Sequence, residues 1–233
     1  MNNPERNDFM LFKKSLAVIT ALSLSLSLCA CGAKTTSAPK ATQKPVATAT
    51  AKAPSKSIEE LTQNKDYITI TVKINGEVKE MKGEVYPDLA PETVANFEKL
   101  ASEGFYKGLI FHRVIPGFMI QGGGFTEDMK QKQADSIKGE FDSNGFENPL
   151  KHEKGVLSMA RTQVPDSASS QFFIMHEVSP HLDGEYAAFG KITEGLEVID
   201  EIATVETTAL ANGMADVPVE PVVIEDIIYN SEN

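Results

Sequence analysis

The sequence predicts a mainly β fold, either an antiparallel sandwich or a barrel. Three observations carry this prediction. Many short β-prone segments are separated by turn residues, only two segments show helical spacing, and neither a strand–helix alternation nor an internal repeat connects them. The chain has 233 residues, of which 41% are hydrophobic, and this suits one globular domain with a sizeable core.

The strands are predicted from alternation and from short apolar runs. Between Tyr67 and Ile74, apolar and polar residues alternate, as expected for a half-buried strand. Asn75-Gly76 is the strongest short signal for a hairpin turn, and it leads into a second strand near 77–86. Further strands are predicted at residues 109–115, 118–121, 155–160, 171–176, 187–192 and 222–229.

Two helices are predicted. Residues 91–103 begin with Pro91, which is favoured at the first helical position, and they stop before Gly104. Residues 195–203 place three large aliphatic side chains on one side at helical spacing. Both segments therefore have one apolar side that can pack against a sheet.

Residues 1–30 are predicted to be a secretory signal peptide rather than part of the fold. A pair of lysines precedes an apolar, serine-rich run that ends in small residues. The alternative is a transmembrane anchor, but the fifteen residues from Leu16 to Ala30 are fewer than the ~20 that a helix needs to cross a bilayer. Acidic residues before Met10 are unusual for a signal, so Met10 is a second candidate start of translation.

The end of this segment, Leu28-Cys29-Ala30-Cys31-Gly32, resembles the cleavage motif of bacterial lipoproteins, in which a cysteine becomes the lipid-modified first residue. Cys31 fits this role better than Cys29, because a small residue precedes it. The alternative is two ordinary apolar cysteines in a signal core. No cysteine follows Cys31, so the domain predicted at residues 58–233 has no internal disulfide.

Residues 31–57 are predicted to combine the lipid-modified cysteine with a disordered basic tether, since they carry five lysines and no acidic or aromatic residue. Residues 58–233 carry 14 Lys and Arg against 31 Asp and Glu, a formal charge of −17. A basic tether suits an anionic membrane surface, whereas the acidic domain disfavours nucleic acid as a partner. We therefore expect a lipid-anchored protein on the extracytoplasmic side of the cell membrane.

Four blocks of the sequence stand together in this domain: "FHRVIPGFMIQGG" (111–123), "GVLSMAR" (155–161), "SSQFFI" (169–174) and "HLDGEYAAFGKITEGLEVIDEIA" (181–203). In order and spacing they resemble the cyclophilin family of peptidyl-prolyl isomerases, and the resemblance runs from about Tyr67 to Tyr229. It implies an eight-stranded antiparallel closed barrel capped by two α-helices, with the active site in a surface groove. It also implies that neither a cofactor nor a metal is needed.

Peptidyl-prolyl isomerisation requires a hydrogen-bond donor in an apolar pocket. Rotation about an amide bond has a barrier of ~18–20 kcal/mol, because the nitrogen lone pair is delocalised into the carbonyl. At the twisted transition state this lone pair is back on the proline nitrogen, so a donor aimed there stabilises the transition state more than the planar ground state. Arg113, the single arginine of an apolar, β-prone stretch, suits this role.

By resemblance, the catalytic residues are Arg113, Phe118 and Gln121, with Gln121 expected to orient Arg113 and the substrate carbonyl. The backbone at Arg161 is expected to hydrogen-bond the peptide. The substrate-binding residues are expected to be Met119, Ala160, Arg161, Gln171, Phe173, Leu182 and Tyr186. The implied partners are proline-containing unfolded or extended polypeptides, and the implied function is to accelerate the folding of exported proteins at the outer face of the membrane.

The chain departs from the family's pattern at the rim of the groove. It contains no tryptophan, and His181 stands where many members have tryptophan before "LDG". That tryptophan offers an N–H donor and a large contact area to cyclosporin-type inhibitors, so we expect weakened cyclosporin binding. Tyr186 stands where members often have histidine, and Arg161 stands where they often have asparagine.

Other functions are less favoured by the residues. The four histidines show no metal-ligand spacing, and Gly122–Gly124 is not followed by the Gly-Lys-Ser/Thr signature of a phosphate loop. Ser158, Ser169 and Ser170 have no obvious histidine partner, which disfavours a hydrolase. Two alternatives to the isomerase remain: a proline-peptide-binding chaperone or scaffold with incidental turnover, and an adhesive surface lipoprotein.

Overall fold

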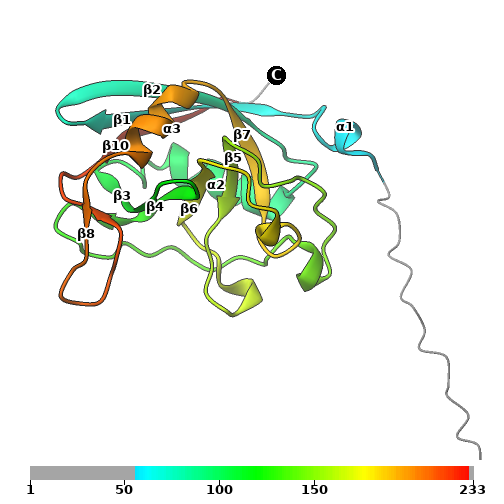
Figure 1. Cartoon of the computed structure of the whole chain (residues 1–233). Coiled ribbons are helices and arrows are strands. Elements are labelled where there is room, and N and C mark those ends of the chain that lie inside the picture. Colours follow the sequence, from blue (N-terminus) through cyan, green and yellow to red (C-terminus); the bar gives the residue numbers. More distant parts are fainter. Residues whose placement is uncertain (1–55, 231–233) are drawn as a thin grey trace, which may run out of the picture. The chain divides into compact units, whose positions relative to one another are not determined.

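The computed structural model describes residues 56–230 (Figure 1). Within this range eight strands close an antiparallel barrel, as predicted: β1 (Asp66–Ile74), β2 (Glu77–Val85), β3 (Leu109–Ile115), β4 (Met119–Thr126), β5 (Val156–Met159), β6 (Phe172–Met175), β7 (Ala188–Glu194) and β10 (Val223–Asn230). Their order around the barrel is β1-β10-β3-β4-β6-β5-β7-β2. The predicted signal peptide, Cys31 and almost all of the predicted tether lie outside the described residues.

Two helices cover the barrel. α2 (Pro91–Ser102) and α3 (Leu196–Ala203) confirm the two predicted helices, and each differs from its prediction by one residue at one end. Elements of two to four residues were not predicted, because they are too short to show periodicity: α1 (Ile58–Leu61), the 3₁₀ helices η1 (Asp142–Asn144), η2 (Pro165–Ser167) and η3 (Pro180–Leu182), and the strand pair β8 (Thr207–Thr208) and β9 (Val217–Pro218). In the part of the chain that the structure describes, no helix is long and apolar enough to cross a membrane.

The barrel interior is filled with apolar side chains. In β1, every second residue from Ile68 to Ile74 is buried. Phe97 of α2 enters the same core, where its ring centroid lies 5.6 Å from that of Phe172 and 5.2 Å from that of Phe189. Because side chains fill a barrel of eight strands, a substrate site must lie on the outer surface.

Strand β6 is buried on both of its faces. Phe172 and Ile174 belong to the barrel core, whereas Phe173 and Met175 belong to a second, smaller apolar cluster. A strand that is covered on both sides reads as a continuous apolar run, as "FFIM" does. This second cluster carries the candidate site.

Strand β3 contains a β-bulge at His112. Phe111 lies opposite Gly122 of β4 and Arg113 lies opposite Gln121, so β3 advances two residues where β4 advances one. A bulge of this kind changes the direction of the side chains that follow it. Phe111 is in the barrel core, and Arg113, two residues later, instead lines a pocket on the outside.

Strand β4 runs beyond its predicted end at residue 121, through three consecutive glycines to Thr126. The prediction was wrong here because it took the glycines as the end of the strand. A Cβ atom on Gly124 would lie 2.5 Å from Cγ of Gln171, so glycine permits a close approach of the segment that precedes β6.

Candidate active site

The outward-facing residues of four neighbouring strands form one row. Arg113 of β3 lies opposite Gln121 of β4. Gln121 lies opposite Phe173 of β6, which in turn lies opposite Ser158 of β5. The antiparallel register therefore places a cation, an amide and an aromatic ring side by side, although they are far apart in the sequence.

A pocket opens over this row, with about 430 Å³ of empty volume that is partly open to solvent. Nine of the ten predicted groove residues line it: Arg113, Phe118, Met119, Gln121, Ala160, Arg161, Phe173, Leu182 and Tyr186. The tenth, Gln171, lines an adjoining and more polar depression that shares Gln121, Ala160 and Arg161 with the pocket. The structure thus brings the predicted residues together in one continuous groove.

Aromatic rings form much of the pocket wall. Tyr186 meets Phe173 edge to face, with 5.8 Å between the ring centroids. Phe118 stacks on His181 with a centroid distance of 5.6 Å, so the histidine forms part of the pocket rim. Buried Leu182 completes an apolar seat of the size and chemistry that a proline ring fits.

Gln121 is held by Gln171 rather than by Arg113. Its Nε2 donates to Oε1 of Gln171 at 3.0 Å, and within the described residues no hydrogen bond joins it to Arg113. The expectation that Gln121 orients Arg113 directly is therefore not met in this structure. Gly124 allows this arrangement, because a side chain there would collide with Gln171.

Arg113 is half-buried at one side of the pocket. Among residues 56–230, no hydrogen bond or ion pair engages its guanidinium group. A partly desolvated cation without an internal acceptor is favourable only if something else supplies the acceptor. Its donors are therefore available to a molecule that enters the pocket.

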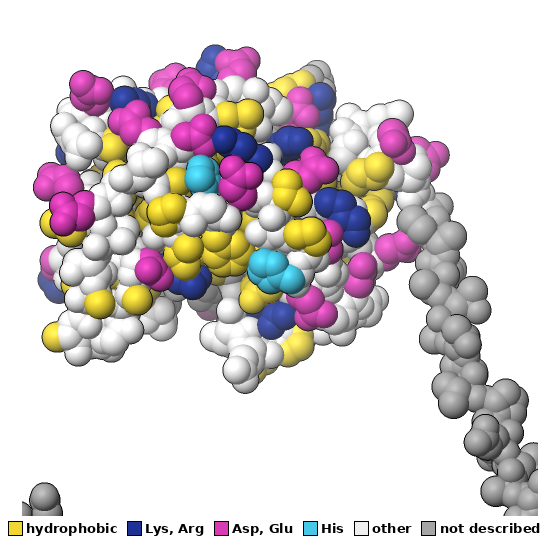
Figure 2. Space-filling view, in the orientation of Figure 1, with side chains coloured by type: hydrophobic (Ala, Val, Ile, Leu, Met, Phe, Trp, Pro, Cys, Tyr) yellow, Lys and Arg dark blue, Asp and Glu magenta, His cyan; other side chains and the backbone are white. Residues whose placement is uncertain are grey.

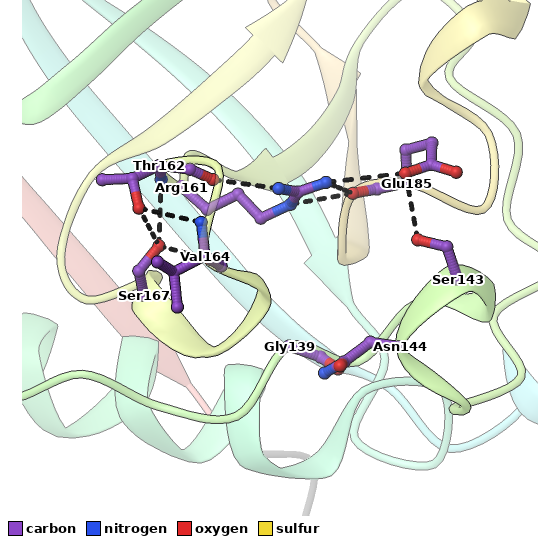
Figure 3. A network of polar contacts seen from close by, with 8 residues as sticks. All are labelled: Gly139, Ser143, Asn144, Arg161, Thr162, Val164, Ser167 and Glu185. Atoms are coloured by element: carbon purple, nitrogen blue, oxygen red, sulfur yellow. Dashed lines mark hydrogen bonds and ion pairs between the residues drawn. The ribbon is translucent and has the colours of Figure 1, made fainter.

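Arg161 lies across the same pocket and is fully engaged, as Figure 3 shows. Its Nε and Nη2 atoms donate to the carbonyl of Glu185 at 3.0 and 2.8 Å, and its Nη1 donates to the carbonyl of Thr162 at 2.9 Å. The guanidinium also lies over the rings of Phe141 and Tyr186, 4.8 and 4.7 Å from their centroids. The side chain thus joins two loops of the groove, a role that the sequence did not indicate.

The loop that contains Arg161 is itself closed by hydroxyl groups. Oγ of Ser167 accepts from the backbone N–H of Thr162 at 2.9 Å and donates to the carbonyl of Val164 at 2.6 Å (Figure 3). Within the described residues, the backbone N–H of Arg161 takes part in no hydrogen bond. It remains free for a peptide, as the resemblance implied for the backbone at this position.

His112 lies beside Arg113 in the bulge and is neutral near pH 7. Burial lowers the pKa of His112 to about 4, and the positive charge of Arg113 acts in the same direction. Nδ1 of His112 is buried without a hydrogen-bond partner in the described part of the chain. Arg113 is therefore the cation on this side of the pocket.

Behind Phe173, His152 bridges Ser158 and Asp183, a partnership that the sequence did not reveal. Its Nε2 lies 3.0 Å from Oγ of Ser158, and its Nδ1 lies 3.1 Å from Oδ1 of Asp183. Burial lowers the pKa of His152. The order of groups is that of a hydrolase triad, but Ser158 is 0% exposed and His152 is 1% exposed, so no substrate reaches the hydroxyl.

The residues around the groove carry mixed charge. On the face drawn in Figure 2, hydrophobic side chains gather near the centre, and acidic side chains with some basic ones are spread around them. Among residues 56–230, no group of three or more His, Cys, Asp or Glu residues is arranged to hold a metal ion. The pocket itself is lined by guanidinium, amide and aromatic groups.

The chain matches known proteins over almost the whole described part. The family model for cyclophilin type peptidyl-prolyl cis-trans isomerase/CLD covers residues 68–228. Peptidyl-prolyl cis-trans isomerase A of Dickeya dadantii is 48% identical over 142 residues, which are 58% of this chain and 72% of that protein. Peptidyl-prolyl cis-trans isomerase B of Escherichia coli is 47% identical over 152 residues, which are 61% of this chain and 88% of that protein.

The fold has a counterpart among solved structures. A cyclophilin type peptidyl-prolyl cis-trans isomerase of Cryptosporidium parvum, crystallised in the presence of the dipeptide Ala-Pro, is similar with a TM-score of 0.57 and 29% identity. The similarity covers 71% of this chain and 99% of that one. By its barrel, its groove and these relatives, the chain belongs to the cyclophilin-type family and is a peptidyl-prolyl cis-trans isomerase.

Proposed function

We propose that Arg113 catalyses the isomerisation by donating a hydrogen bond to the proline nitrogen at the twisted transition state. The observation that carries this proposal is the unengaged guanidinium at the edge of an apolar pocket. In the planar ground state the nitrogen lone pair is delocalised and accepts poorly, so the bond forms mainly at the transition state. The apolar surroundings strengthen it by excluding water.

The other groove residues bind and orient the peptide. The proline ring occupies the seat made by Phe118, Met119, Phe173, Leu182 and Tyr186. The Gln121–Gln171 pair presents amide groups to the substrate carbonyl. The backbone N–H of Arg161, which has no acceptor within the described residues, donates a hydrogen bond to the peptide. No nucleophile and no proton transfer are needed, which agrees with the burial of Ser158.

The test compares turnover with binding in the full chain. Arg113→Ala should lower the catalysed exchange of an Ala-Pro peptide by ~10²–10³-fold, the usual loss when one transition-state donor is removed. Peptide affinity should change by much less, because the planar substrate does not offer the lone pair. Exchange is measured by NMR, with a binding isotherm on the same variant. Unchanged exchange would favour the alternative of a proline-peptide-binding chaperone or scaffold.

We further propose that the enzyme works at the outer face of the cell membrane, on exported proteins that fold there. The sequence supports this with a signal-like segment, a lipoprotein-like motif at Cys31 and a basic tether of five lysines. Lipid chains contribute ~0.8 kcal/mol per buried CH₂, and a basic segment adds attraction to anionic lipid. The acidic domain, by contrast, has no electrostatic reason to lie on the membrane.

Mass spectrometry of the mature N-terminus tests the anchor. A diacylated or triacylated Cys31 and recovery of activity in the membrane fraction are the expected results. Cys31→Ser should leave the precursor uncleaved or release the protein from the membrane. An unmodified N-terminus at residue 32 or later would overturn the anchoring proposal and leave the isomerase mechanism untouched.

A further inference from the structure

His176, just after β6, supports the turn that carries Phe118. The backbone N–H of Gly117 donates to Nδ1 of His176 at 2.8 Å. On the other side of the ring, Nε2 lies 3.2 Å from Oδ1 of Asp200 on α3. The imidazole thus spans from the β3–β4 turn to a helix, and none of the groove predictions includes it.

These two contacts assign the tautomer of His176. Nδ1 faces an N–H donor, so it carries the lone pair, and Nε2 faces a carboxylate, so it carries the proton. A second proton on Nδ1 would place two donors 2.8 Å apart and remove the bond to Gly117. The support of the turn therefore depends on a neutral ring.

The backbone of His176 holds the same turn. Its N–H donates to the carbonyl of Phe118 at 2.9 Å, and the N–H of Glu177 donates to that carbonyl at 3.3 Å. Within the turn, the N–H of Phe118 donates to the carbonyl of Ile115 at 3.1 Å. Side chain and backbone of one residue thus fix both Gly117 and Phe118.

We propose that His176 is a positioning residue for the proline seat and that its protonation makes proline binding sensitive to acid. With Nδ1 free of a proton, Gly117 is held and the ring of Phe118 faces the pocket. With Nδ1 protonated, the turn loses this support and the seat loosens. The inference rests on the proposed role of Phe118 as part of the seat.

The charges around His176 favour this response. Asp200 faces it from α3, Lys154 bonds the same carboxylate from the loop before β5, and Glu177 follows in the chain. The hydrogen bond from Lys154 holds the pKa of Asp200 below its usual range, so this carboxylate stays ionised in mild acid. An ionised Asp200 attracts the protonated ring on its Nε2 side and offers nothing to the proton on Nδ1.

Two substitutions distinguish the loss of the hydrogen-bond acceptor for Gly117 from the loss of the titratable imidazole ring. His176→Asn places Oδ1 near the position of Nδ1, so it keeps an acceptor for Gly117 but does not titrate. His176→Leu removes the acceptor. We expect His176→Leu to raise KM about fivefold with little change in kcat, because the seat binds ground and transition states alike. We expect His176→Asn to stay within about twofold of the wild type; an unchanged KM in His176→Leu would overturn the proposal.

The pH profile gives a second and independent readout, which decides the matter even if His176→Leu fails to fold. As the pH is lowered, kcat/KM of the full chain should fall about fivefold in the wild type and stay flat in His176→Asn. His181→Asn should keep the fall, which separates the effect from the ring that stacks on Phe118. A flat wild-type profile, or an equal fall in His176→Asn, would overturn the proposal.

The NMR signal of the Gly117 amide tests the role of His176 independently of the proposed role of Phe118. The amide resonance of Gly117 should shift on acidification in the wild type and not in His176→Asn, whatever the catalytic role of the turn. If Phe118→Ala leaves KM unchanged, the seat proposal fails while this resonance still reports the state of His176. If the resonance does not move with pH, the positioning proposal fails by itself.

Discussion

Two arginines line the same pocket, and the structure treats them in opposite ways. Arg113, on the barrel side, has no internal partner in the described part of the chain. Arg161, on the loop side, makes three hydrogen bonds and lies between two aromatic rings. A cation near a site is thus available for chemistry only if the fold leaves its donors unused. The other arginine joins loops and shapes the opposite wall.

The largest expected effect comes from replacing the free arginine by lysine. Arg113→Lys keeps the charge but loses the planar fork of donors, and an ammonium on a flexible chain is positioned poorly. We expect kcat/KM to fall on the order of 10²-fold, with the free energy of unfolding almost unchanged because no internal bond is lost. NMR exchange and urea denaturation of the same sample give both values. Wild-type activity in this variant would mean that Arg113, like Arg161, has no direct role in the reaction.

The second test uses pH on the Arg113 side. His112 takes up a proton at about pH 4 in the folded chain but near 6.5 in the unfolded chain, so the unfolded chain binds more protons between these values. Stability is therefore complete above about pH 6.5 and is lost as the pH falls toward 4, by up to roughly 3 kcal/mol. His112→Gln, which does not titrate, should lose correspondingly less over the same range. Parallel denaturation curves at pH 7 and pH 4 measure the difference.

The third test concerns Arg161, where we expect the opposite balance, with a larger effect on stability than on activity. Arg161→Ala removes three hydrogen bonds from a charged group whose side chain is 12% exposed. We expect a loss of about 2 kcal/mol in the free energy of unfolding, with kcat/KM reduced by less than about tenfold. Denaturation and exchange assays on one preparation compare the two effects. A variant that is fully stable but inactive would show that Arg161 acts on the substrate directly.

The smallest expected effect concerns the rim between the two walls. His181 stacks on Phe118, at the position where the family pattern often has tryptophan. His181→Trp adds contact area and an N–H donor, and we expect it to tighten cyclosporin binding about tenfold. Inhibitor titrations against isomerase activity compare the variant with the wild type. Full sensitivity of the unmodified protein would mean that the histidine already replaces the indole.

Much of the fold was predictable because its signals are local. The alternation from Ile68 to Ile74, the Asn75-Gly76 turn and Pro91 at the start of α2 each act over a few residues. The composition of the pocket was also predictable, because it follows from motifs that are continuous in the sequence. These motifs specify which residues meet, but not the bonds between their side chains.

What could not be predicted depends on contacts between segments that are distant in the sequence. The pairing of Gln121 with Gln171 depends on the register of β4 and on the absence of a side chain at Gly124. The link between His152 and Asp183 spans 31 residues of sequence and joins the loop before β5 to the residue that follows η3. The engagement of Arg161 requires the carbonyl of Glu185, and no side-chain pattern reports where a carbonyl points.

The extra residue in β3 has a consequence for how the active site is encoded. If His112 were instead paired in regular register opposite Gln121, Arg113 would lie opposite Ile120, and the alternation would turn its side chain toward the barrel core. The same amino acids would then form a barrel of similar composition without a guanidinium group in the groove. The placement of Arg113 thus depends on the register of two strands as well as on the identity of their residues.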